Sequence, residues 1–146
     1  MQLSTSRVWI LAAALLLPAC VPIPHRYYFA PTLRGIVTSA GVPVKGAELR
    51  LSGQFTKKVA TISTDSAGHF EIGPLRTWEA VTWLFGDPMY GYSLSIRVSG
   101  SEYLGLDVGR IGYATPELEI TCDLTKPDTD VHMPQYCTPT DNTVHP

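Results

Sequence analysis

The sequence is poor in charge, and this shortage excludes several kinds of protein. Only 16% of its 146 residues are charged, the formal net charge is −2, and no basic cluster is longer than Lys57-Lys58. Nucleic-acid-binding proteins need Lys and Arg side chains to neutralise phosphates, so we expect no nucleic-acid partner. The length, with 45% hydrophobic residues, is typical of one globular domain.

Motifs of the common enzyme classes are also missing. The chain has no Gly-rich phosphate loop, no nucleophile elbow and no catalytic-looking Cys beside a His. The histidines are dispersed along the sequence, which favours solvated side chains over a shared site. They are His25, His69, His132 and His145. The sequence therefore predicts no enzyme, no cofactor and no bound metal.

The N-terminus has the three parts of an export signal. Arg7 is the only charged residue before an apolar run from Val8 to Leu17, and a small-residue site that ends at Cys20 follows. The run stops at Pro18, which makes it shorter than the roughly 20 apolar residues of a transmembrane helix. Residues 1–19 are therefore predicted to be a signal peptide rather than a membrane span.

The segment Leu17-Pro18-Ala19-Cys20 resembles the bacterial lipobox, which has Leu three residues before its Cys and a small residue directly before it. The resemblance implies that Cys20 carries a thioether-linked diacylglycerol and becomes an acylated N-terminus. Each buried methylene contributes about 0.8 kcal/mol, so several acyl chains anchor a protein firmly. Val21 stands where an Asp would resemble an inner-membrane retention signal. We therefore expect a lipid anchor in the outer membrane, facing the periplasm.

The remaining two cysteines predict a single disulfide. With Cys20 used for lipid, Cys122 and Cys137 are left near the C-terminus, and an exported chain then has no odd thiol. A disulfide is favoured in an oxidising compartment and would contribute roughly 3 kcal/mol. The alternative is a metal site with Cys122, His132 and Cys137 as ligands.

Prolines in residues 20–31 argue against a helix or a central strand, so this stretch is predicted to be a tether. Its aromatic residues, Tyr27-Tyr28-Phe29, would either pack on the edge of the domain or contact a membrane or partner.

From Thr32 onward the hydrophobic pattern has period two and turn residues are dense, which favours short strands. An all-β sandwich is predicted over residues 32–125, followed by a disulfide-linked C-terminal tail over residues 126–146. The seven expected strands are Leu33–Ser39, Ala47–Leu51, Val59–Ser63, His69–Ile72, Tyr92–Val98, Tyr103–Val108 and Pro116–Leu124.

Three segments resemble the carboxypeptidase regulatory-like domain: Gly35-Ile36-Val37, Gly41 to Leu51 (GVPVKGAELRL) and Thr64 to Ile72 (TDSAGHFEI). The resemblance covers residues 32–125 and implies a seven-stranded sandwich of the transthyretin-like or Ig-like type. It implies fold rather than chemistry, with Asp65 and Gly68 in a tight hairpin turn and Phe70 returning to the core. The Tyr-Arg-Gly-Ser signature of transthyretin-like hydrolases is absent.

The segment Thr77 to Phe85 is too long and too rich in bulky residues for a hairpin turn. We expect one or two helical turns, with Trp78, Val81 and Phe85 on one face. The alternative is that both tryptophans of this segment close the open end of the core. The candidate contacts for a partner are Trp78, Trp83, Phe85 and Tyr90.

Two groups of polar residues could form a chemical site, a Lys–Asn cross-link or a metal site, or could simply be solvated. Lys45, Asn142 and Glu71 are the residue types of the Lys–Asn cross-link found in collagen-adhesin B-type domains, although Lys45 and Asn142 lie outside the expected core strands. An extended segment would place three alternating residues near the C-terminus on one side as metal ligands, but a solvated acidic loop is the favoured explanation. These residues are Asp128, Asp130 and His132.

Together these patterns predict a lipid-anchored cell-envelope protein that acts as a non-enzymatic binding or assembly module. Its expected partners are the membrane, through the lipid, and another envelope protein. The alternative is a periplasmic enzyme or metal-binding protein whose site has no recognisable motif.

Overall fold

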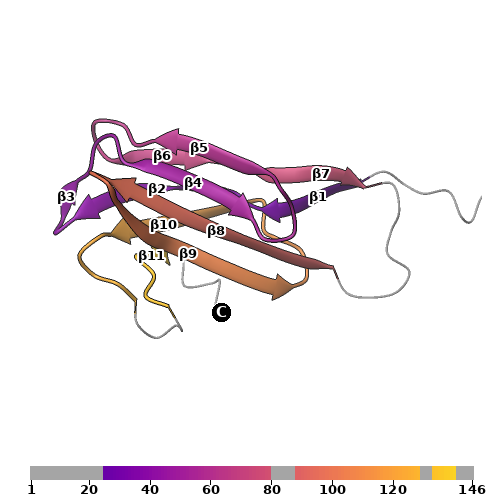
Figure 1. Ribbon diagram of the computed structural model, residues 1–146. Coiled ribbons are helices and arrows are strands. Elements are labelled where there is room, and N and C mark those ends of the chain that lie inside the picture. The colour runs from indigo at the N-terminus through magenta and orange to yellow at the C-terminus, as the bar shows by residue number, and fades with distance from the viewer. Residues whose placement is uncertain (1–24, 80–87, 129–132, 141–146) are drawn as a thin grey trace, which may run out of the picture.

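A computed structural model of the protein describes residues 25–79, 88–128 and 133–140. Within these ranges the chain forms strands and turns without a helix, which confirms the predicted all-β class. The same ranges contain no helix that could cross a membrane. Figure 1 shows long, twisted strands that run along the length of the molecule.

The first sheet is built around β2 (Thr32–Ser39). One side of β2 pairs in parallel with β10 (Glu117–Asp123), and the other side pairs antiparallel with β6 (His69–Ile72) and then β3 (Val42–Pro43). The short strand β11 (Cys137–Pro139) pairs antiparallel with β10. Because β2 and β10 are neighbours, the first and last predicted strands of the domain lie side by side.

The second sheet has four antiparallel strands in the order β5-β4-β8-β9. They are β5 (Val59–Ser63), β4 (Glu48–Gly53), β8 (Met89–Val98) and β9 (Ser101–Ile111). A separate two-stranded ribbon is formed by β1 (His25–Ala30) and β7 (Leu75–Glu79), which pair antiparallel.

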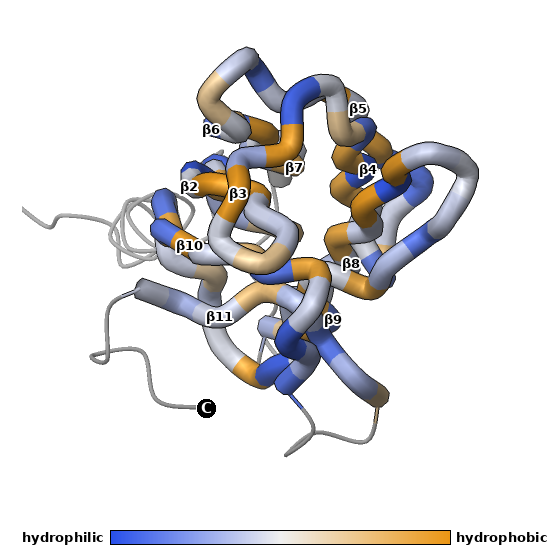
Figure 2. The backbone as a smooth tube through the Cα atoms, turned by 90° about the vertical axis from the view of Figure 1, so that its left-hand side faces the viewer, coloured by the Kyte–Doolittle hydropathy of each residue, from blue (hydrophilic) through white to orange (hydrophobic). Residues whose placement is uncertain are grey.

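The two sheets bury one common core. Along β4 the buried Leu49 and Leu51 alternate with the exposed Glu48 and Arg50, because successive side chains of a strand point to opposite faces. Figure 2, viewed along the strands, shows β2 and β10 in one layer and β4 and β8 in the other. The largest fully buried side chains come from both layers: Leu33, Val37 and Ile120 from the first sheet, and Leu49, Leu51, Leu94 and Ile96 from the second.

All seven predicted strands are present, with ends that differ from the predictions by at most three residues. The described residues nevertheless contain eleven strands, so the predicted count of seven is wrong. The additional strands are β1, β3, β7 and β11. Two of them, β3 and β11, have two and three residues, too few for a period-two pattern to be recognised.

The predicted tether is wrong over residues 25–30, which form β1. The prolines flank this strand, at Pro24 and Pro31, and do not interrupt its hydrogen bonds. The predicted helical turns are also wrong where the chain is described, because Leu75–Glu79 is the strand β7. Bulky residues suit either structure, and pairing with β1 decides for a strand. Val81 and Phe85 lie outside the described residues.

The hairpin at Asp65–Phe70 is as predicted. The Asp65 carboxylate accepts hydrogen bonds from the backbone N–H groups of Ala67 and His69, at 2.8 and 2.9 Å. Gly68 has a φ of 77°, a left-handed conformation that favours glycine, and Phe70 is buried. Asp65 therefore has a structural role in a turn.

Candidate functional site

Four strand ends meet at one end of the molecule. Paired strands place His25 beside Glu79 and Met89 beside Ile111, so β1 and β8 start where β7 and β9 finish (Figure 1). We call this the open end. Four large apolar or aromatic side chains in this region are more than half exposed: Trp78 (66%), Met89 (51%), Ile111 (69%) and Tyr113 (64%).

The ribbon β1–β7 carries aromatic and cationic side chains on its outer face. Arg26 lies opposite Trp78 and Tyr28 lies opposite Arg76, and residues directly opposite in an antiparallel pair share a face. The Arg26 guanidinium carbon lies 5.1 Å from the centre of the Trp78 ring, a cation–π contact worth about 0.5–1 kcal/mol at an exposed site. In addition, the Lys58 ammonium donates a hydrogen bond to the Arg76 carbonyl oxygen.

The inner face of the ribbon is attached to the sandwich by Tyr27. This side chain is buried, and its hydroxyl donates a hydrogen bond to the Met89 carbonyl oxygen of β8. Its ring makes edge contacts with Phe29 and Tyr113, at centroid distances of 5.0 and 6.3 Å. For Tyr27 and Phe29, packing on the edge of the domain is therefore the correct alternative.

The outer face of the second sheet has a hollow of about 490 Å³, lined by three serines, two charged residues and two larger residues. Its floor follows neighbouring strands, with Ser52 on β4 and Ser93 and Ser95 on β8. Among the described residues, neither the Ser95 hydroxyl nor the Arg50 guanidinium has a hydrogen-bond or ion-pair partner. The complete lining is Arg50, Ser52, Ser93, Ser95, Glu102, Tyr103 and Leu104. This hollow, which we call the serine hollow, can supply hydrogen-bond donors and one cation to a polar ligand.

A second hollow of about 370 Å3 lies on the outer face of the first sheet, but its cation is already paired. Arg34 contacts Glu71 at 3.0 Å and Glu117 at 2.8 Å, and these contacts raise the pKa of its guanidinium, the hydrogen bond to Glu71 first. An anionic ligand would have to displace two carboxylates. The serine hollow is therefore the better candidate for binding.

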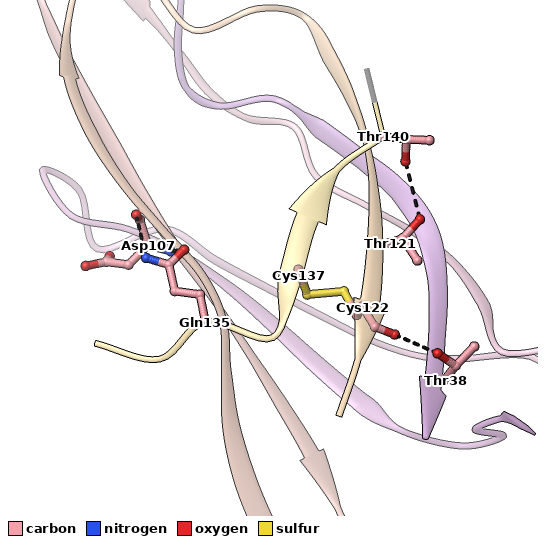
Figure 3. Close-up of a disulfide and its surroundings, with 7 residues drawn as sticks. All are labelled: Thr38, Asp107, Thr121, Cys122, Gln135, Cys137 and Thr140. Carbon is pink, nitrogen blue, oxygen red and sulfur yellow. Dashed lines mark hydrogen bonds between the residues drawn. A yellow bond between two sulfur atoms is a disulfide. The ribbon is translucent and has the colours of Figure 1, made fainter. Parts of the chain in front are cut away.

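The predicted disulfide between Cys122 and Cys137 is present. It joins opposed residues of β10 and β11, whose Cα atoms lie 4.0 Å apart (Figure 3). The Thr38 hydroxyl of β2 donates to the Cys122 carbonyl oxygen at 3.1 Å. Two residues before Cys137, the Gln135 side-chain oxygen accepts a hydrogen bond from the Asp107 N–H of β9 at 3.2 Å. The expected tail is thus bound to both sheets around the disulfide.

The pKa values of two groups are shifted by their surroundings. Burial raises the pKa of the Tyr92 phenol well above its usual value. Hydrogen bonds from the Thr125 hydroxyl, at 2.7 Å, and from the Thr125 N–H lower the pKa of the half-buried Asp123 carboxyl. Neither group belongs to a cluster in the described chain that suggests acid–base catalysis.

No family model and no curated protein matches this chain.

Of the predicted partner contacts, the structure exposes Trp78 and packs Tyr90 against the core. The Tyr90 ring stacks on Tyr92 at a centroid distance of 6.5 Å. Trp83 and Phe85 lie outside the described residues, as do Cys20, Asn142, Asp130 and His132. No three His, Cys, Asp or Glu side chains gather closely enough for a metal site in the part of the chain that the structure describes.

Two groups of residues were not predicted from the sequence. Arg26 and Arg76 each precede an aromatic residue by two positions, so period two would have placed them on the faces of Tyr28 and Trp78. Similarly, Ser93 and Ser95 alternate with the buried Leu94 and Ile96. This alternation is a signal for a small-residue outer face.

Proposed function

We propose that the protein is a lipid-anchored component of a bacterial cell envelope that acts as a non-enzymatic binding module. The observation that carries this proposal is the segment Leu17-Pro18-Ala19-Cys20 after a short apolar run. The disulfide supports it, because Cys122 and Cys137 use the remaining thiols and leave Cys20 for lipid. The expected location is the outer membrane, on the periplasmic side.

The fold suits a protein held close to a bilayer. Strand β1 begins at His25, five residues after Cys20. Five residues of extended chain span at most about 18 Å, so the anchor would hold the domain near the membrane surface whatever their conformation. The proposed fold type is the transthyretin-like sandwich of the carboxypeptidase regulatory-like domain, which supplies a rigid support rather than a catalytic site.

The serine hollow is the proposed binding surface. Arg50, Ser93 and Ser95 leave a cation and hydroxyl groups available. These groups suit a ligand that carries hydroxyl and carboxylate groups, because each can donate a hydrogen bond to an oxygen acceptor. Since the lining residues lie on paired strands of one sheet, their backbone positions are fixed before a ligand binds.

Radiolabelled palmitate fed to the native host tests the anchor. The wild-type protein should become labelled and sediment with membranes, and Cys20→Ser should abolish the label. Cys122→Ala with Cys137→Ala is the matched control, because it removes the other thiols and should leave labelling unchanged. A wild-type protein recovered unlabelled and outside the membrane fraction would refute the proposal.

A further inference from the structure

We propose that the open end of the sandwich rests on the bilayer, with Trp78, Met89, Ile111 and Tyr113 in the interfacial region and with Arg26, Arg76 and Lys58 facing lipid phosphates. This inference rests on the proposed acylation of Cys20. It assigns the membrane surface as the occupant of the exposed apolar residues, and it fixes which end of the domain points toward the lipid.

The position of the anchor in the chain is the first argument. Strand β1 starts at the open end, at His25, and Cys20 can lie no more than about 18 Å from that point. The opposite end of the molecule, where β3 lies, is separated from His25 by the length of the long strands (Figure 1). The lipid therefore holds the open end, rather than the β3 end, against the membrane.

The exposed side chains of the open end are the second argument. Met89 and Ile111 are direct neighbours across β8 and β9. Tyr113 contacts Tyr27 on the inner face of the ribbon, and Trp78 is exposed on its outer face. Trp and Tyr are enriched where a membrane meets water, because the ring has an apolar body and a polar tip. Several exposed apolar side chains at the same end of a domain are typical of an interaction site.

Charge is the third argument. The outer face of the ribbon places Arg26 and Arg76 beside Trp78 and Tyr28, and Lys58 reaches the same strand through the Arg76 carbonyl. Cations beside interfacial aromatic residues match a surface of anionic phosphates under an apolar layer. A protein partner could bind anywhere on the domain, whereas these cations and aromatic residues lie at the end that carries the anchor. We therefore favour the lipid surface as the occupant.

Brominated lipids test this contact directly, since bromine quenches the fluorescence of a tryptophan that touches the acyl region. The lipidated protein with Trp83→Phe keeps Trp78 as its reporter and is placed in vesicles of phosphatidylcholine and phosphatidylglycerol. The matched control carries Trp78→Phe, Trp83→Phe and Val42→Trp, which moves the reporter to the exposed Val42 at the β3 end. We expect at least a twofold loss of fluorescence for Trp78 and no loss for the control.

The charge requirement has its own variant. Arg26→Glu with Arg76→Glu should reduce the quenching of Trp78 in vesicles that contain phosphatidylglycerol and have little effect in phosphatidylcholine alone. If Trp83→Phe does not fold, the wild type is compared with Trp78→Phe, which should lose most of the quenching.

Each outcome separates this inference from the proposed function. An intact mass without acyl chains would refute the anchor itself. Acylated protein whose Trp78 is not quenched, or is quenched no more than the Val42→Trp control, would refute contact at the open end while the anchor stands. Protection of Trp78 by a bound envelope protein in place of lipid would also overturn the inference.

Discussion

At the scale of single residues, Gly35 shows how a strand position can require the absence of a side chain. A Cβ added at Gly35 would lie 2.0 Å from the Ile120 carbonyl oxygen, and that oxygen belongs to the backbone of the neighbouring strand β10. The clash cannot be relieved by a rotamer change, so the parallel pairing of β2 and β10 itself would have to shift. This close approach explains the glycine in the Gly35-Ile36-Val37 segment.

Gly35→Ala should therefore destabilise the protein. We expect a loss of about 1–3 kcal/mol or more, in the range of overpacked cores, measured as the free energy of unfolding in urea. Gly109→Ala is the matched control, since its Cβ would meet only the end of the Gln54 side chain at 3.3 Å. Equal stabilities for the two variants would show that β10 does not constrain Gly35.

At the scale of elements, the ribbon β1–β7 illustrates how one strand can face both the protein and the solvent. Tyr27 is buried against β8 and Tyr113, whereas Trp78 on the partner strand is 66% exposed. Because successive side chains of a strand point to opposite faces, the two faces of the ribbon carry different residues. Contact with β8 decides which face is buried.

The ribbon predicts opposite results for its two aromatic residues. Tyr27→Ala should lower the free energy of unfolding by about 3–5 kcal/mol, as for a large aromatic side chain removed from a core. Trp78→Ala should change it by no more than about 0.5 kcal/mol, apart from the small loss of the contact with Arg26. Thermal and urea unfolding of both variants measures this. If β1 were a tether, both substitutions would change the free energy of unfolding little. If Trp78 belonged to the core, both would lower it strongly.

The disulfide is the second element with a measurable contribution. Cys122 and Cys137 are 15 residues apart in the sequence, and the bond between them should contribute roughly 3 kcal/mol by restricting the unfolded chain. Reduction of the Cys20→Ser protein should raise its mass by two hydrogens and lower its urea midpoint, whereas the double variant Cys122→Ala with Cys137→Ala should already have the lower midpoint and be unaffected by reductant. Two thiols alkylated before reduction would contradict this expectation.

At the scale of the whole molecule, the two sheets are parts of one cooperative unit because they share a core. Leu33 of the first sheet and Leu94 of the second are both fully buried and belong to one apolar cluster. Neither sheet can bury its inner face without the other, so the domain should not lose one sheet before the other.

Core truncations on either side test this unity. Leu33→Ala and Leu94→Ala should each lower the free energy of unfolding by about 2–5 kcal/mol and keep a single transition. Unfolding is followed by tryptophan fluorescence and by far-UV circular dichroism, and the two curves should coincide. Transitions that separate in one variant would mean that the sheets fold independently. Ser95→Ala, on the outer face of the second sheet, is the control and should change stability little.

The sequence by itself determined the features that depend on neighbouring residues. Alternation placed seven of the eleven strands of the described residues, the Asp65–Gly68 turn was recognisable from its residue types, and cysteine parity predicted the bond between Cys122 and Cys137. The leader and the lipid on Cys20 remain predictions from the sequence.

Only the tertiary structure decided which face of each strand is covered. The aromatic residues of 27–29 and Trp78 have the same local pattern whether they are core, tether or interface. Tyr27 and Trp78 differ in burial because β8 and Tyr113, which are distant in the sequence, cover Tyr27 and leave Trp78 in solvent. The serine hollow likewise exists only because β4, β8 and β9 lie side by side. Burial depends on chain segments brought together by folding, and a period-two pattern records only that two faces differ.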